Sequence, residues 1–187
     1  MSLVESISAN DFGVVNPKDT VRIERLLPGP IERIWAYLTE DQKRRQWMAA
    51  GPIELTTGGT VCHLFDNSKL TDRDDRPPAK YAAHAGPVES RGTITACEPP
   101  RLLSYTWAEE TGVPSKVRFD LTEQGNKVLL VVTHSRISSH DMMLSFAAGW
   151  HTHLDILADR LNDREPSPFW PKHTALEAEY GKRFPAF

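Results

Sequence analysis

A long apolar stripe near the end of the chain is the feature that most constrains its fold. Apolar residues recur there at spacings of 4, 3, 4, 3 and 4, at Met143, Ala147, Trp150, Leu154, Leu157 and Leu161. This spacing predicts one helix with a continuous apolar seam over about five turns. The seam has to be buried against another layer of structure, so the rest of the chain must supply that layer.

Most of the preceding sequence alternates with the period of two that is typical of strands. TVRIERLL (20–27) predicts a first strand, followed by two short helices, one over 31–38 and one from a cap at Thr39 to about Trp47. The segment 66–87 has no sustained period and many turn formers, so it is expected to be a long loop. The remaining strands are expected as a pair within 52–65, joined at Gly58-Gly59, and as one strand in each of 88–100, 101–108, 116–123 and 127–135.

These elements predict an α+β fold. One long helix cannot cover an antiparallel sheet of this size unless the sheet curls around it. We therefore expect a curved antiparallel sheet wrapped around the long C-terminal helix, with two short helices after the first strand. The 187 residues suit a single domain. We expect an N-terminal leader over 1–19, the domain over 20–162 and a tail over 163–187 that packs on the domain or on a second subunit.

Charge and hydropathy exclude several classes of protein. Lys and Arg total 22 against 25 Asp and Glu, which gives a net charge of −3. The chain therefore lacks the excess of basic residues that is typical of nucleic-acid-binding proteins. No run approaches about 18 consecutive apolar residues, so no membrane span is expected, and the N-terminus lacks the basic and apolar regions of a secretory signal. Two cysteines, Cys62 and Cys97, are typical of a reducing compartment, which favours a cytoplasmic protein.

Four stretches of the sequence carry a resemblance to a known family. They are PGPIERIWAYLT, RGTITACEPPRLLSYTW, KVRFDLTEQGNKVLLVVTHSRI and GWHTHLDILADRL. On these words the chain resembles the START-like (SRPBCC, helix-grip) superfamily, in particular its branch of activator of heat shock protein 90 ATPase homologues. The resemblance implies a deep, largely apolar cavity between the long helix and the inner face of the sheet. It implies as partner a lipid, polyketide, hormone or aromatic compound, or a chaperone, as in other members of the family.

The seam helix carries two histidines that invite a metal site. His151 and His153 are two residues apart, which splays their side chains about 160° apart on a helix, whereas two ligands of one metal require a spacing of four. No metal site is therefore expected. Asp155 lies four residues after His151, which favours a hydrogen bond at the protein surface or at the boundary of the core. His153 is left as either a boundary residue or a residue at the edge of the cavity.

The other polar residues carry no catalytic motif. His134 lies on an apolar strand and is expected to be a core histidine with a hydrogen bond, and His63 raises the same question. Asp72, Asp74 and Asp75 lack the glycine and distal glutamate of a calcium loop, so they are expected to be solvated. There is no Gly-x-Ser-x-Gly motif and no glycine-rich phosphate loop. No catalytic residue and no cofactor is assigned.

Aromatic residues from separate elements would come together in a helix-grip fold. Each aromatic side chain buries roughly 150 to 250 Å², so each is either part of the core or a wall of the cavity, and both interpretations stay open. The residues expected to line the cavity are Trp35, Phe65, Tyr105, Trp107, Phe119, His134, Trp150, His153 and Leu154.

These observations favour a protein that binds an apolar or aromatic small molecule without catalysing a reaction. Two alternatives stay open. One is a co-chaperone that contacts a heat-shock ATPase, which follows from the resemblance alone. The other is a cyclase-like or hydrolase-like enzyme that uses a cavity histidine, for which His134 and His63 are the candidates. A homodimer is also left open.

Overall fold

The structure is a computed structural model that describes residues 12–15, 19–71, 75–184 and 186. Most of the expected leader, together with Asp72 and Asp74 of the long loop, lies outside the described residues. Of the leader, the described residues Val14 and Val15 pair with the first long strand and add a short edge strand to the sheet.

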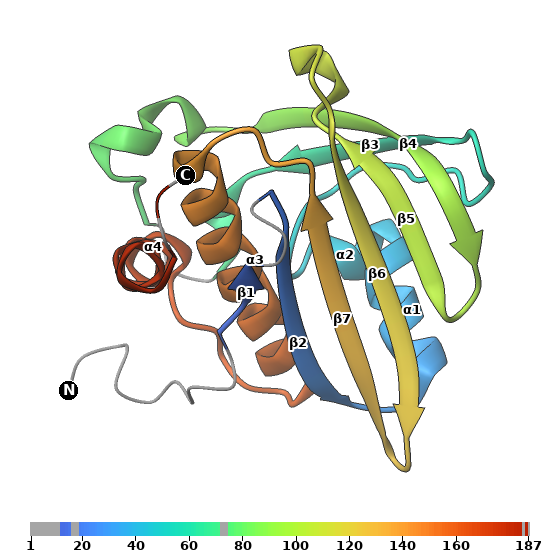
Figure 1. Ribbon diagram of the computed structural model, residues 1–187. Coiled ribbons are helices and arrows are strands. Elements are labelled where there is room, and N and C mark those ends of the chain that lie inside the picture. Colours follow the sequence, from blue (N-terminus) through green and yellow to red (C-terminus); the bar gives the residue numbers. More distant parts are fainter. Residues whose placement is uncertain (1–11, 16–18, 72–74, 185, 187) are drawn as a thin grey trace.

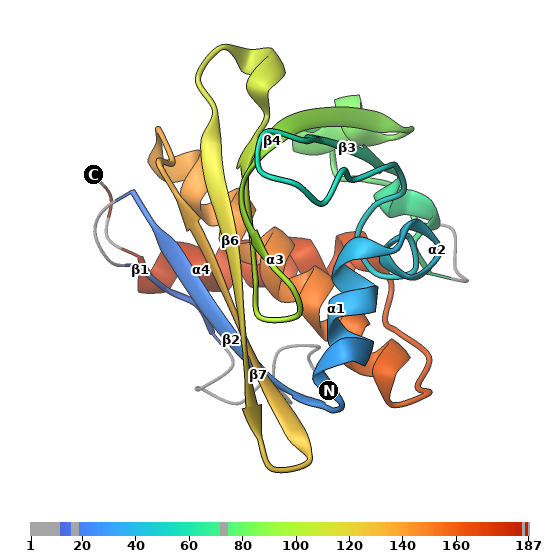
Figure 2. The ribbon, with the colours of Figure 1, turned by 90° about the vertical axis from the view of Figure 1, so that its right-hand side faces the viewer.

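Seven antiparallel strands form one sheet, which confirms the expected curved sheet of an α+β helix-grip fold. Their order is β1-β2-β7-β6-β5-β4-β3. The sheet bends strongly along this order, since β6 runs nearly vertically in Figure 2 while β3 and β4 cross the view. The strands are β1 (Val14–Val15), β2 (Val21–Pro28), β3 (Thr60–Phe65), β4 (Val88–Glu98), β5 (Leu102–Trp107), β6 (Ser115–Gln124) and β7 (Lys127–Ser135).

Helix α3 (His140–Leu161) lies against the concave face of the sheet, as the apolar seam predicts (Figure 1). All six seam residues are buried, and the Ser139 hydroxyl caps the helix by accepting from the Met142 N–H at 3.3 Å. Helix α4 (Phe169–Arg183) packs on α3, on the side of α3 that faces away from the sheet (Figure 1). The shorter helices are α1 (Ile31–Thr39) and α2 (Asp41–Arg44), and the 3₁₀ turns are η2 (Asn67–Lys69), η3 (Ala79–His84) and η4 (Glu109–Thr111).

The β6–β7 hairpin shows how the alternating pattern sets the inner face of the sheet. Gln124 pairs with Lys127 across a two-residue turn in which Gly125 has φ +64°, a conformation that glycine adopts without strain. From this register, alternate residues of both strands point inward. They are Val117, Phe119 and Leu121 on β6, and Val128, Leu130, Val132 and His134 on β7, and all are buried.

Two local expectations were wrong. Thr39 does not cap a second helix, because it is the last residue of α1 and its hydroxyl donates to the Trp35 carbonyl one turn back. The second helix is correspondingly short, Asp41–Arg44. The segment 52–57 is not a strand either: its backbone forms only an isolated bridge, Ile53 to Val61, beside β3.

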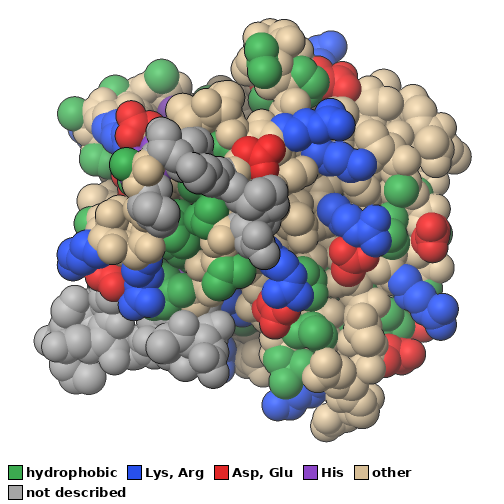
Figure 3. All heavy atoms as spheres, in the orientation of Figure 1, with side chains coloured by type: hydrophobic (Ala, Val, Ile, Leu, Met, Phe, Trp, Pro, Cys, Tyr) green, Lys and Arg blue, Asp and Glu red, His purple; other side chains and the backbone are tan. Residues whose placement is uncertain are grey.

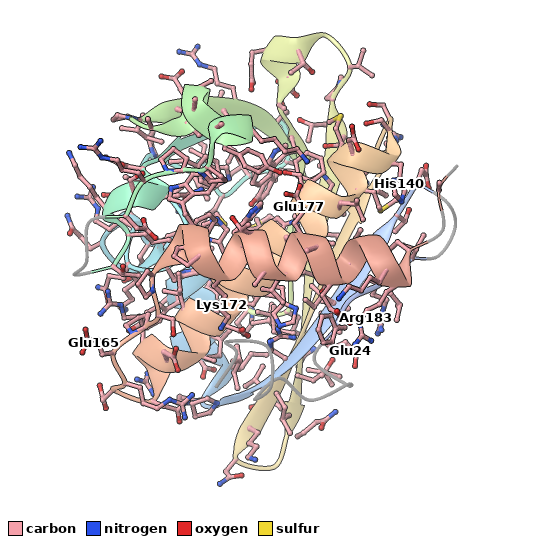
Figure 4. The ribbon with its side chains drawn as sticks, turned by 90° about the vertical axis from the view of Figure 1, so that its left-hand side faces the viewer. Glu24, His140, Glu165, Lys172, Glu177 and Arg183 are labelled. Atoms are coloured by element: carbon pink, nitrogen blue, oxygen red, sulfur yellow. The ribbon has the colours of Figure 1, made fainter. Side chains whose placement is uncertain are left out.

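The tail after α3 is tied to its own domain through the long loop and through α3. On the loop side, Trp170 Nε1 donates to the Ser68 hydroxyl at 3.0 Å, and Lys80 Nζ lies 2.8 Å from a Glu177 carboxylate oxygen. On the α3 side, Lys172 pairs with Asp155 at 2.6 Å. Figure 4 shows Lys172 and Glu177 projecting from opposite sides of α4. The tail thus holds the 66–87 segment and α3 together.

Two properties of the described residues bear on possible partners. None of their helices combines the length and apolar character that crossing a membrane requires. On the face shown in Figure 3, basic and acidic side chains are interspersed, in keeping with the balanced charge of the sequence. That face offers no large patch of a single charge.

Candidate functional site

A cavity of about 270 Å³ lies between the inner face of the sheet, α3, α4 and the long loop. Aromatic side chains form a large part of its walls. The sheet contributes Phe65 and Trp107, and α3 contributes Phe146 and Trp150. The loop and the tail complete it with Tyr81, Phe169 and Trp170. Seven aromatic side chains from four parts of the chain therefore enclose one space.

The structure divides the nine expected cavity residues into two groups. Phe65, Trp107, Trp150 and His153 line the cavity. The other five do not: Trp35 on α1 is partly buried against the core, and four are fully buried behind the wall, at Tyr105, Phe119, His134 and Leu154. Three of them pack against lining residues: Tyr105 against Trp107, and Phe119 and His134 against Trp150.

His134 shows how this supporting layer positions the wall. The Trp150 indole N–H donates to His134 Nδ1 at 3.0 Å, so that nitrogen carries no proton. The neutral ring therefore carries its proton on Nε2, which donates to the Ser115 hydroxyl at 2.7 Å. Burial lowers the pKa of His134 to about 3, which keeps the ring neutral. Both nitrogens are used within the protein, so His134 orients Trp150 and is not a free base.

His153 faces the cavity with one nitrogen already committed. Its Nδ1 lies 2.8 Å from the Trp47 carbonyl oxygen, and a carbonyl only accepts, so Nδ1 carries the proton. In the neutral ring Nε2 is then an acceptor. Burial lowers the pKa of His153 to about 4, only partly offset by the Trp47 hydrogen bond, so the ring is neutral near pH 7. Two interpretations were left open for His153, and the structure supports the one that places it at the edge of the cavity.

His173, on α4, is a second cavity histidine and was missed by sequence reasoning. Its ring stacks on Phe169 at 5.6 Å between centroids. Its Nδ1 is buried with no hydrogen-bond partner among the described residues. Burial lowers the pKa of His173.

The other two histidines of interest lie away from the cavity. The expectation that His151 lies at the surface or at the boundary of the core was wrong. Its side chain is fully buried, because α4 and Phe12 cover it. Its Nδ1 lies 3.0 Å from the Tyr180 hydroxyl, and its Nε2 lies 3.5 Å from the Asp155 carboxylate. His63 is buried among aromatic rings, both of its nitrogens lack a partner, and burial next to Arg44 lowers its pKa to about 3.

The charged residues that line the cavity are acidic. Glu89 and Glu110 belong to the lining, whereas no lysine or arginine of the described residues does. The described residues also contain no group of three His, Cys, Asp or Glu side chains arranged to hold a metal ion. The arrangement can therefore enclose a flat apolar molecule and accept hydrogen bonds from it.

Of the cavity residues that sequence reasoning missed, Phe146 lies on the predicted α3, but four others lie outside the regular pattern. Tyr81 belongs to the long loop, and Phe169, Trp170 and His173 belong to the tail. The only signal was the aromatic opening of the tail, PSPFWPKH, because such residues rarely stay exposed together. That signal predicts packing, but the direction in which each residue points depends on where α4 lies.

Comparison with known proteins agrees with this architecture. The family model for activator of Hsp90 ATPase homolog 1-like proteins matches residues 28–162. This chain belongs to that family. The match ends before α4, so Phe169, Trp170 and His173 are cavity residues that this family member supplies from outside the matched region.

Several solved structures share the fold. The protein encoded by gene BPP1335 of Bordetella parapertussis is 42% identical, with a TM-score of 0.75 over 94% of this chain and 93% of that chain. CalU16 of Micromonospora echinospora is 21% identical, with a TM-score of 0.64 over 92% of each chain. DynU16, from the dynemicin biosynthetic locus, is 20% identical, with a TM-score of 0.62 over 82% of this chain and 51% of that chain. No curated protein matches the chain.

Proposed function

We propose that this protein binds a planar, largely apolar small molecule in the cavity between α3, α4 and the sheet. The observation that carries the proposal is the aromatic wall: seven aromatic side chains line one space of about 270 Å³. Empty apolar cavities of about 150 Å³ are large enough for benzene. A cavity of this size therefore suits a molecule of about two fused rings.

The wall is held in a fixed shape, which favours binding. Trp150 is hydrogen-bonded to His134, and Trp170 to Ser68, so neither indole has to be ordered when a ligand enters. His134 also stacks on Phe146, with ring centroids 4.3 Å apart. Binding to a preorganised wall avoids part of the entropy cost of ordering side chains.

The solved structures add support at the level of the fold. CalU16 and DynU16 have the same fold, and DynU16 comes from the dynemicin biosynthetic locus. A fold shared with a protein from such a locus is compatible with small-molecule binding. Contact with a heat-shock ATPase rests on the family description alone, and no described feature favours it over the cavity.

The experiment that tests the proposal fills the cavity from the α3 side. Gly149 lines the cavity, and a Cβ placed on it meets no atom within 4 Å. In Gly149→Leu the added side chain should occupy the binding space and should leave the helix intact, because leucine favours helix more than glycine does. Gly181→Leu on α4 is the matched control, since Gly181 is an exposed helical glycine outside the cavity.

Binding is measured with naphthalene and 2-naphthol through tryptophan fluorescence and melting temperature. We expect both probes to quench the fluorescence of the native protein and to raise its melting temperature. We expect Gly149→Leu to weaken binding at least tenfold, and Gly181→Leu to leave it unchanged. The proposal is overturned if neither probe binds the native protein, or if the folded Gly149→Leu variant binds as the native protein does.

A further inference from the structure

The cavity contains hydrogen-bond acceptors that no protein donor satisfies. We infer that its ligand is an aromatic molecule carrying neutral hydrogen-bond donors, as a phenol does, and that His153 on α3 and His173 on α4 accept them. This inference rests on the proposed function, because it names the chemical class of ligand for the same cavity.

The proton on His153 points away from the ligand. Nδ1–H donates to the Trp47 carbonyl oxygen at 2.8 Å. The proton must belong to Nδ1, because a carbonyl oxygen can only accept a hydrogen bond. Nε2 is the remaining nitrogen, and in a neutral ring it offers only a lone pair. No protein group donates to Nε2 among the hydrogen bonds of the described residues.

His173, on α4, presents a second ring nitrogen without a partner. Its Nδ1 is buried and has no partner among the described residues. With the proton of the neutral ring on Nε2, this Nδ1 offers a lone pair. A buried acceptor without a donor costs about 1 to 3 kcal/mol of stability, and a ligand that supplies the donor recovers that cost.

Both histidine rings contact the ring of Phe169. The centroid of Phe169 is 4.8 Å from that of His153 and 5.6 Å from that of His173. A third lining residue, Asn67, also has a buried oxygen without a partner. The acceptors thus line one part of the cavity next to the aromatic wall, where a flat ligand with polar hydrogens at its edge meets both.

The charges of the lining argue against an anionic ligand. Glu89 and Glu110 line the cavity, and no described lysine or arginine does. Lys80, the basic residue beside Tyr81, is paired with Glu177. Glu89 is paired with Arg91, so a carboxylate in the cavity would find no cation in the lining left to offset its desolvation. A neutral donor meets the acceptors without that cost.

The test compares probes of one shape that differ only in their polar group. They are 2-naphthol, 2-methoxynaphthalene, 2-naphthoate and naphthylmethylammonium, titrated into the full-length protein by calorimetry. We expect 2-naphthol to bind at least fivefold more tightly than its methyl ether, and 2-naphthoate to bind most weakly. Equal binding of naphthol and its ether, or tightest binding of the naphthoate or the ammonium probe, overturns the inference and leaves the proposed function standing. Failure of every probe to bind overturns both.

Variants assign the effect to His173. His173→Phe keeps an aromatic ring beside Phe169 and removes the acceptor, so the advantage of naphthol over its ether should fall about fivefold. His173→Asn places an amide oxygen near the Nδ1 position and should restore most of that advantage. His140→Phe, at a histidine outside the cavity, should leave the advantage unchanged. If His173→Phe folds and keeps the full advantage, His173 is not the acceptor.

Discussion

The Trp150 indole N–H donates to His134 Nδ1 at 3.0 Å, and both residues are buried. This bond joins the seam of α3 to the inner face of β7 at the wall of the cavity. Because His134 in turn bonds to Ser115, one imidazole fixes a cavity-lining indole and a strand hydroxyl at once. The histidine therefore acts through Trp150 and does not touch a ligand itself.

Replacement of His134 by phenylalanine should destabilise the protein by about 2 to 4 kcal/mol, because it leaves the Trp150 N–H and the Ser115 hydroxyl buried without partners. Ser115→Ala removes only the outer bond and should cost about 1 kcal/mol. Urea unfolding followed by tryptophan fluorescence measures both. Equal stability of the native protein and His134→Phe would show that the bond does not contribute.

The buried histidines predict that stability falls as the pH is lowered below about 6.5. The folded pKa values of His63, His134 and His151 are lowered to about 3 and that of His153 to about 4, chiefly by burial. In the unfolded chain these groups take up protons near pH 6.5, so in this window the unfolded state binds more protons than the folded state. The contribution of these histidines to the free energy of unfolding is therefore fully present above about pH 6.5. It is lost progressively as the pH falls toward their pKa values in the folded protein.

Urea unfolding at pH 7.5, 6.0 and 5.0 tests this dependence. We expect the free energy of unfolding to decrease at each step, by an amount on the order of several kcal/mol in total. Asp155 reinforces the trend only at lower pH, because its lowered pKa affects stability below its ordinary range. His134→Phe carries one fewer buried histidine and should show a shallower dependence. A stability that is constant from pH 7.5 to 5.0 contradicts the prediction.

The Asp155 carboxylate is the centre of an ion cluster beneath α4. It lies 2.9 Å from Arg25 of β2 and 2.6 Å from Lys172 of α4, and all three side chains are at least 80% buried. Asp155→Asn should cost about 3 kcal/mol, because two cations lose their counter-ion in a site that water reaches poorly.

The matched control for Asp155 is Asp159→Asn, one turn further along α3. Asp159 pairs with Arg164, which is 60% exposed, and such surface pairs contribute about 0 to 1 kcal/mol. Thermal unfolding compares the two variants. Equal destabilisation by both would show that the cluster beneath α4 is no stronger than a surface pair.

Trp170 contacts the long loop, and we expect these contacts to keep the loop ordered. Its ring stacks on Tyr81 with centroids 5.5 Å apart, and its N–H donates to Ser68. Trp170→Leu should destabilise the protein by about 2 to 4 kcal/mol through lost packing. Hydrogen exchange should then quicken in residues 67–84 and remain slow in the β6–β7 hairpin. Faster exchange in both regions alike would mean that Trp170 supports the whole fold and not this loop in particular.

The sequence by itself determined the fold and the family. The seam of α3 and the alternation of β6 and β7 follow from local periodicity, because each pattern matches only one type of backbone repeat. The same periodicity placed Tyr105 and Trp107 on one face of β5. It did not show that Trp107 lines the cavity while Tyr105 is covered, since that depends on where the sheet bends away from α3.

Only the tertiary structure decided the burial and the hydrogen-bond partners of the two histidines of the seam helix. Helical spacing placed His151 and His153 on opposite sides of the apolar seam, and both side chains are buried. α4 buries His151 against Tyr180, and the Trp47 carbonyl turns the free nitrogen of His153 toward the cavity. The position of a residue on a helix follows from the sequence around it. What lies opposite that position comes from residues 29 and 106 positions away in the chain, whose packing no local pattern records.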